Sequence, residues 1–254
     1  MRLRWKTIRK VWATTGAVVG VVFITWSLIA FSASASARAA LNSDARVTVT
    51  RGDGYWRLQP LAATPGAAGI VFFPGSPVEP AAYAPLLRST AERGYTALLV
   101  ELPRRGVLGG ADGPEVLARA RAAIASVPTV SRWVVAGHSR GGVVACMAAR
   151  DGFPGLAGLV LIGTSHPRDF SLAQLRVPVT RIFGTRDTVA DEYRLEATRV
   201  NLPASTRFVR IDGGNHSQFG SYGFGPGDWP ATISREAQQQ ITRNAILDLL
   251  AALR

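Results

Sequence analysis

The chain opens with one long apolar run. Val11 to Phe31 spans 21 residues without a charge. At about 1.5 Å per residue in a helix, such a run matches a hydrocarbon core of about 30 Å. Five basic residues and no acidic one precede it, a bias that keeps the N-terminus in the cytoplasm. We therefore predict a cytoplasmic basic tail over residues 1–10 and a transmembrane signal-anchor helix over residues 11–31, with the rest of the chain outside the cytoplasm.

Small residues follow the apolar run and leave an alternative open. Ala33-Ser34-Ala35 and Ala35-Ser36-Ala37 both resemble signal-peptidase sites. A cleaved signal needs only about 7–15 apolar residues, so the longer run favours an uncleaved anchor at the cell membrane over secretion after cleavage. Residues 32–43 lack periodicity and are predicted to form a linker. On this basis, removal of residues 1–40 is expected to leave an intact, soluble and active domain.

Beyond residue 43, short apolar segments alternate with segments of helical periodicity. Strands are predicted at 46–51, 55–58, 68–73, 95–102, 132–136, 159–162, 179–183 and 207–211, and helices at 80–93, 115–127, 141–149, 192–200 and 233–253. Buried strands that alternate with helices indicate a mostly parallel sheet with helices on both faces. Residues 44–254 are therefore predicted to form a single α/β domain.

Composition and charge narrow the classes of function. With 18% charged residues and a mean hydropathy of +0.14, the chain is not globally disordered. The net charge is +12, but six of the 29 basic residues and no acidic residue lie in residues 1–40. The remaining excess is scattered, so no nucleic-acid surface is predicted. One cysteine excludes an internal disulfide, and without a metal-ligand cluster or a phosphate-binding glycine loop we expect no metal and no cofactor.

The strongest chemical signal follows the strand predicted at 132–136. There the sequence reads Gly137-His138-Ser139-Arg140-Gly141 and enters a predicted helix. A G-x-S-x-G motif between a strand and a helix is typical of a nucleophile elbow, where a sharp turn lifts the serine hydroxyl clear of the sheet. The helix N-terminus also favours developing negative charge. Ser139 is therefore the predicted nucleophile.

A serine nucleophile needs a base, and the base needs an orienting acid. Of the three histidines, His138 adjoins the nucleophile and is expected to be a packed structural group. His166 follows the next strand and is a candidate pocket residue. His216 follows the last predicted strand, and Asp187 follows the strand at 179–183, which matches the chain order serine, acid, histidine. We predict His216 as the base and Asp187 as the acid.

An oxyanion requires two backbone N–H donors. The residue after the nucleophile, Arg140, supplies one, and the turn after the strand at 68–73 supplies the other. Pro74 has no N–H, which leaves Gly75 or Ser76. We favour Ser76 as the donor and keep Gly75 as a pocket residue.

These motifs together carry a resemblance that covers roughly residues 55–253. They read Phe73-Pro74-Gly75-Ser76, Gly137-His138-Ser139-Arg140-Gly141-Gly142, Gly184-Thr185-Arg186-Asp187 and Gly214-Asn215-His216-Ser217. The chain resembles small bacterial α/β-hydrolases of the dienelactone-hydrolase-like kind (alpha/beta hydrolase family 5). The resemblance implies the α/β-hydrolase fold and the same triad of Ser139, Asp187 and His216. Arg140 departs from the pattern, because such proteins usually carry leucine or another apolar residue there.

The segment between the sixth and seventh predicted strands bears on access to the site. Many relatives insert a cap domain there, but only eleven residues, 166–176, are available in this chain. We therefore predict no cap and an open site. The predicted function is that of a serine hydrolase of carboxylic esters, with a small-molecule or lipid-like substrate and a membrane anchor. An acyltransferase with the same triad is the alternative, followed by a non-catalytic binding protein of the cell envelope.

Overall fold

A single eight-stranded sheet forms the centre of the molecule in the computed structural model, which describes residues 2–64, 66–111 and 113–253. The strands are β1 (Val47–Gly52), β2 (Tyr55–Pro60), β3 (Gly69–Phe73), β4 (Ala97–Val100), β5 (Trp133–His138), β6 (Leu156–Ile162), β7 (Val179–Gly184) and β8 (Arg207–Ile211). Their order is β1-β2-β4-β3-β5-β6-β7-β8. β2 runs antiparallel to both its neighbours, and the strands from β4 to β8 are parallel.

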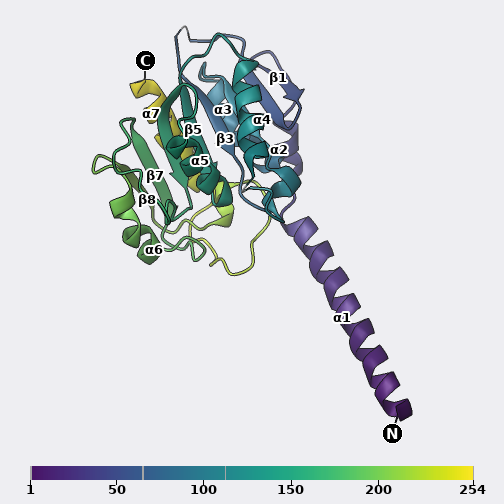
Figure 1. The fold of residues 1–254 in the computed structure, drawn as a ribbon. Helices are drawn as coiled ribbons and strands as arrows, with labels where there is room; N and C mark the ends of the chain where they lie inside the picture. The colour runs from purple at the N-terminus through teal and green to yellow at the C-terminus, as the bar shows by residue number, and fades with distance from the viewer. Residues whose placement is uncertain (1, 65, 112, 254) are drawn as a thin grey trace.

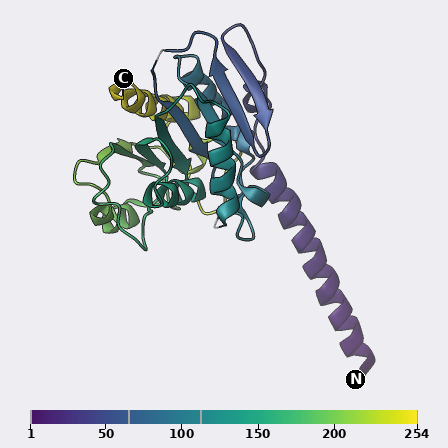
Figure 2. The same cartoon turned by 45° about the horizontal axis from the view of Figure 1, so that its top comes forward.

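Helices cover both faces of this sheet, and one helix stands apart from it (Figures 1 and 2). They are α1 (Arg2–Ala30), α2 (Ala35–Ala39), α3 (Ala84–Ala91), α4 (Pro114–Ala125), α5 (Arg140–Arg150), α6 (Glu192–Ala197) and α7 (Arg235–Ala252). Among the described helices, α1 alone is long and apolar enough to cross a membrane. It projects from one edge of the domain.

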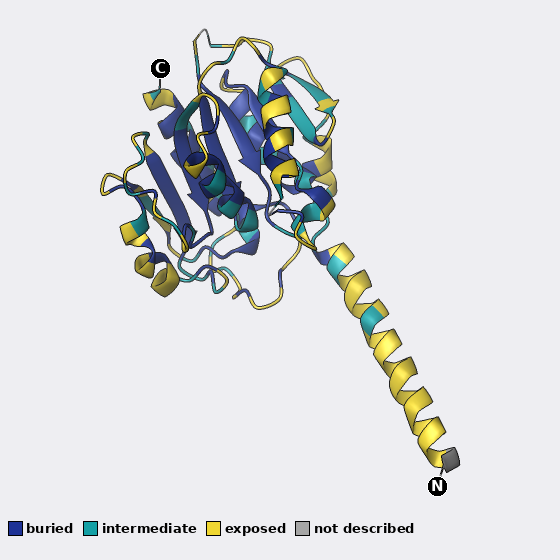
Figure 3. Cartoon of the chain, viewed as in Figure 1, coloured by how far each residue is buried: buried dark blue, intermediate teal, exposed yellow. Residues whose placement is uncertain are grey.

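The two faces of the sheet bury separate apolar layers (Figure 3). In β3, Ile70 and Phe72 pack in the layer that α3 and α7 cover, whereas Val71 and Phe73 pack in the layer that α4 and α5 cover. Successive side chains of a strand point to opposite faces, so an entirely apolar strand is buried on both sides. This confirms the predicted α/β architecture with helices on both faces.

Several element boundaries differ from the prediction. The helix predicted at 80–93 divides into a 3₁₀ turn (Pro80–Tyr83) and α3, because Pro85 lies in the first turn of α3 and cannot donate a helical hydrogen bond. β5 continues to His138, directly before the motif serine. Residues 163–178, between β6 and β7, contain neither helix nor strand, so no cap domain occupies this position.

The segment predicted to be a linker instead packs on the domain. It contains α2, whose Ala37 is fully buried, and Ala33 before it is 5% exposed; both join the apolar layer of α3 and α7. Arg38 also forms an ion pair with Glu79 (2.6 Å). Small side chains allow this close contact. We therefore expect the stable domain to begin near residue 30, and we expect removal of residues 1–40 to cost stability.

Two truncations test where the domain begins. Removal of residues 1–29 is expected to leave the melting temperature of the domain unchanged, because α1 is exposed. Removal of residues 1–40 deletes Ala33 and Ala37 from the core, which costs about 2 kcal/mol of apolar burial and lowers Tm by several degrees. Thermal unfolding of the two variants measures the difference. Equal melting temperatures would show that α2 adds no stability.

The single cysteine is expected to be inert in the folded protein. Cys146 lies on α5 and is fully buried, and burial raises the pKa of its thiol to about 12. Since the thiolate is the reactive form, iodoacetamide should not modify it at neutral pH until the chain is unfolded in guanidinium. Intact-mass measurement before and after unfolding reports this directly. Complete modification of the native protein would contradict the buried position.

Candidate active site

Ser139 lies on a sharp turn between β5 and α5. Its backbone has φ 53° and ψ −119°, a conformation that residues other than glycine rarely adopt. The turn is held by the Ser139 N–H, which donates to the carbonyl oxygen of Ile162 (2.9 Å). The arrangement of strand, strained serine and helix is the one that the motif predicts for a nucleophile elbow.

The glycines of the motif are required by close backbone packing. A Cβ at Gly137 would lie 2.1 Å from the carbonyl oxygen of Gly141, and a Cβ at Gly141 would lie 2.1 Å from that of Phe73. No side chain fits at either distance. The sequence G-x-S-x-G therefore follows from the approach of α5 to the ends of β3 and β5.

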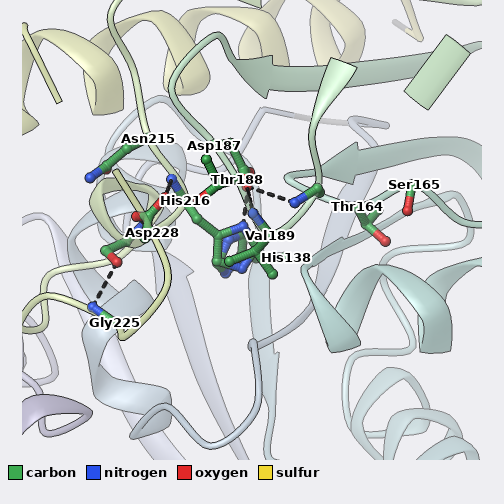
Figure 4. Close-up of polar contacts among 12 residues, drawn as sticks. His138, Thr164, Ser165, Asp187, Thr188, Val189, Asn215, His216, Gly225 and Asp228 are labelled. Carbon is green, nitrogen blue, oxygen red and sulfur yellow. Dashed lines mark hydrogen bonds and ion pairs between the residues drawn. The ribbon is translucent and has the colours of Figure 1, made fainter. Parts of the chain in front are cut away.

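Asp187 and His216 meet at the carboxyl edge of the sheet (Figure 4). Asp187 follows β7, and its Oδ1 accepts the backbone N–H groups of Val189 (2.9 Å) and Ala190 (2.7 Å). Its Oδ2 accepts from Nδ1 of His216 at 2.8 Å. A carboxylate can only accept, so Nδ1 of His216 carries the hydrogen and Nε2 is left as an acceptor. That tautomer suits a general base.

A second carboxylate holds the backbone around His216. Oδ1 of Asp228 accepts the N–H of His216 (3.1 Å), and its Oδ2 accepts the N–H of Ser217 (2.8 Å). Asp228 is itself 5% exposed. The two aspartates thus have separate tasks: Asp187 contacts the imidazole ring, and Asp228 fixes the loop that carries it.

His138 and Tyr83 order the turn after β3. The N–H of Gly75 donates to Oη of Tyr83 (3.1 Å), and this hydroxyl lies 2.7 Å from Nδ1 of His138. Burial, together with the neighbouring His216, lowers the pKa of His138 well below its usual value. His138 is therefore a buried structural group, as expected.

This network also determines which backbone N–H groups of the turn after β3 are available to a ligand. Gly75 uses its N–H for Tyr83, and Pro74 and Pro77 have none. Ser76 is the residue of this turn whose N–H is left for a ligand. Arg140 lies in the first turn of α5, where N–H groups point out of the helix end.

Two hollows meet at Ser139. The first, which we call the apolar hollow, has a volume of about 180 Å³ and is lined by Phe31, Gly75, Ser76, Val78, His138, Ser139, Val189, His216, Ser217, Tyr222, Gly225, Pro226 and Asp228. The second, the polar hollow, has about 170 Å³ and is lined by Ser139, Arg140, Val143, Gly163, Thr164, Ser165, His166, Arg168, Val189 and Ala190. A larger hollow of about 660 Å³ is lined by arginines beside α2 and lacks the triad residues.

The predicted site residues therefore gather around one point. Gly75, Ser76 and His216 line the apolar hollow with Ser139, whereas Arg140 and His166 line the polar one. His166 is half-buried, and burial, with Arg168 nearby, lowers its pKa. Among the described residues, no group of three His, Cys, Asp or Glu side chains could hold a metal ion.

Comparison with known proteins places this arrangement in a family. The family model described as "Alpha/beta hydrolase family" matches residues 69–240, which include Ser139, Asp187 and His216. The chain belongs to the alpha/beta hydrolase family. A 2-succinyl-6-hydroxy-2,4-cyclohexadiene-1-carboxylate synthase from Salmonella paratyphi B is 36% identical to this chain over 114 residues. That alignment spans 43% of each protein, so the chain matches less than half of the length of the synthase.

Solved structures share the fold at low sequence identity. A dienelactone hydrolase-like promiscuous phosphotriesterase from metagenomic libraries superposes with a TM-score of 0.63 at 18% identity, covering 82% of this chain and 99% of that one. A membrane phospholipase A described as a bacterial virulence factor gives a TM-score of 0.57 at 14% identity and covers 98% of this chain and 99% of its own. These likenesses establish the fold and confirm the dienelactone-hydrolase-like resemblance.

The sequence did not assign a role in the site to three residues that the structure places there. Tyr83 lies 55 positions from His138, to which it is hydrogen-bonded. Asp228 is the only acidic residue between His216 and the last helix, and that position was its one available signal. Phe31 is the final residue of the apolar run, and no feature of the sequence indicates that it lines the apolar hollow.

Proposed function

We propose that this protein is a serine hydrolase of carboxylic esters with Ser139, His216 and Asp187 as its catalytic triad. The observation that carries the proposal is the hydrogen bond from His216 Nδ1 to Asp187 Oδ2, with His216 and the strained Ser139 lining the same hollow. A base that is held by an acid and faces the same hollow as a half-buried serine is the arrangement that activates a hydroxyl for attack.

The reaction follows from these positions. Ser139 Oγ attacks the acyl carbon while its proton moves to Nε2 of His216, and the carbonyl oxygen becomes an oxyanion. The backbone N–H groups of Ser76 and Arg140 stabilise that charge. His216 then protonates the leaving alcohol, and an acyl-enzyme remains. A water then gives a proton to His216 and attacks the acyl carbon. The bond from that carbon to Ser139 Oγ breaks, Oγ takes the proton back from His216, and the carboxylic acid leaves.

We further propose that α1 anchors the enzyme in the cell membrane with the domain outside the cytoplasm. Apolar side chains along α1 are exposed, such as Val22 at 62% and Ile29 at 71%. Such a helix surface suits the interior of a lipid bilayer rather than water. The basic residues before the run favour a cytoplasmic N-terminus. Cleavage after Ala37 would remove Ala33 and Ala37 from the core, which favours an uncleaved anchor over a signal peptide.

Covalent labelling tests the nucleophile. A fluorophosphonate probe is expected to label the wild-type enzyme at Ser139, as identified by peptide mass spectrometry, and not to label Ser139→Ala. Ser131→Ala, an exposed serine before the start of β5, is the matched control and should be labelled like the wild type. Labelling of Ser139→Ala at an equal rate would assign the nucleophile elsewhere.

Fractionation of the full-length protein tests the anchor. The protein should stay with membranes after a high-salt wash, because apolar insertion is not screened as surface charge is. Protease added from the outside should digest the domain. A mature form that begins between Ser34 and Ala39 would identify a cleaved signal, and digestion from the cytoplasmic side alone would reverse the orientation.

A further inference from the structure

The end of the apolar helix forms part of the wall of the active site. Phe31 follows α1 directly and lines the apolar hollow with Ser139 and His216. Its ring lies 6.1 Å from that of Tyr222, which lines the same hollow, and 6.5 Å from that of Trp26 on α1. One aromatic residue thus links the helix to the place where the substrate binds.

Hydrogen bonds fix this junction to the loops around the hollow. The carbonyl oxygen of Phe31 accepts the N–H of Glu79 (2.9 Å), and that of Ala30 accepts the N–H of Gly223 (2.9 Å). Ser34 donates its N–H to the carbonyl oxygen of Ser221 (2.8 Å). The end of α1 and the hollow are therefore held at a fixed distance from each other. The position of α1 in a membrane then determines how deep in the bilayer the hollow lies.

That depth follows from the length of the apolar run. If residues 11–31 span a hydrocarbon core of about 30 Å, Phe31 lies at its boundary with the polar headgroups. The ester bonds of membrane lipids lie at the same boundary, between the acyl chains and the headgroups. The apolar hollow is therefore level with such esters.

Exposed apolar residues lie on two of the loops that line the apolar hollow. Phe224 is 50% exposed and Trp229 57%, both on the loop whose Gly225 and Pro226 line the apolar hollow. Val189, 41% exposed, lines it from the loop after β7. Large apolar side chains gathered on loop tips beside a helix of this kind suit insertion among lipids.

We propose that the substrate is an ester-bearing lipid of the membrane leaflet into which the end of α1 emerges. This inference rests on the proposed function. The ester bond of the lipid reaches Ser139 through the apolar hollow, with Phe31 and the loop of Gly225 on its wall. Hydrolysis consumes one water and yields a fatty acid and a lipid with one free hydroxyl. At about 180 Å³ the hollow is smaller than the roughly 300–1,000 Å³ of pockets that enclose a drug-sized ligand, so the remaining hydrocarbon stays in the bilayer.

The test uses the full-length enzyme in vesicles of phosphatidylcholine and phosphatidylglycerol. Fatty-acid release from the vesicle lipid is measured by mass spectrometry, and hydrolysis of soluble nitrophenyl butyrate is measured in the same vesicles. Phe31→Ala is expected to lower the ratio of lipid to butyrate rates by about fivefold, the loss of about 1 kcal/mol of apolar contact in the transition state. The matched control is Phe23→Ala on the lipid-exposed part of α1, which should leave the ratio unchanged.

A second variant, at an exposed position, keeps the proposal testable if Phe31→Ala fails to fold. Phe224→Asp changes an exposed side chain and should also lower the ratio, because a carboxylate resists insertion among lipids. Fatty-acid release that falls for both variants and not for Phe23→Ala supports the proposal. Nitrophenyl butyrate hydrolysis with no fatty-acid release, or equal ratios in all variants, overturns it and leaves the proposed function standing. No hydrolysis of either ester and no fluorophosphonate labelling of Ser139 overturns both.

Discussion

Replacing Ser139 with alanine is expected to lower kcat/KM for an ester by at least about 10³-fold without loss of folding. His216→Ala should have an effect of similar size. The double variant should be no slower than either single variant, since the nucleophile and its base act as one unit and removal of either disables both.

Steady-state kinetics on nitrophenyl butyrate measure all three variants, and circular dichroism confirms their folding. Multiplicative losses in the double variant would show that Ser139 and His216 act independently. Near wild-type turnover by Ser139→Ala would remove it as the nucleophile.

Asp187→Asn is expected to lower kcat by about 10³–10⁴-fold. The amide can no longer hold Nδ1–H of His216 while it also accepts from Val189 and Ala190, so the histidine loses the tautomer that leaves Nε2 as an acceptor. Asp228→Asn is the matched control near the same histidine. It should cost only about tenfold, because Asp228 holds the backbone of His216 rather than its ring.

The comparison separates the two carboxylates by their effect on kcat. Thermal unfolding adds a second readout, because a loosened loop around His216 should lower the Tm of Asp228→Asn. If Asp228→Asn proves the slower enzyme, the acid of the triad would have to be reassigned to Asp228.

Local sequence was sufficient to find the elbow, since a strand, a tight turn and a helix follow one another within the segment 133–150. Chain order then selected Asp187 and His216, because the carboxyl ends of parallel strands meet at one edge of a sheet. The structure brings these two side chains into contact, 29 positions apart. Their catalytic roles stay predictions.

Contacts between distant segments could not be predicted from the sequence. The carboxylate of Glu79 accepts hydrogen bonds from the Arg38 side chain and from the N–H of Ala33, both more than 40 positions away. Nothing in the local sequence of either segment indicates that the two segments meet. The small residues of α2 have the composition of a flexible linker, yet their size is what allows the chain to pack closely on the domain. Phe31 fits the pattern of a membrane span, and that pattern gives no indication that its side chain also lines the apolar hollow.

The backbone of Ser139 has a consequence for evolution and design. At φ 53° and ψ −119°, a glycine would sit without strain while any residue with a Cβ is penalised. Ser139→Gly should therefore be more stable than Ser139→Ala by about 1 kcal/mol, even after the larger chain entropy of unfolded glycine is counted. Selecting this protein for thermostability alone would then favour the replacement of Ser139, so a stability screen needs a parallel assay of turnover to keep the serine in place.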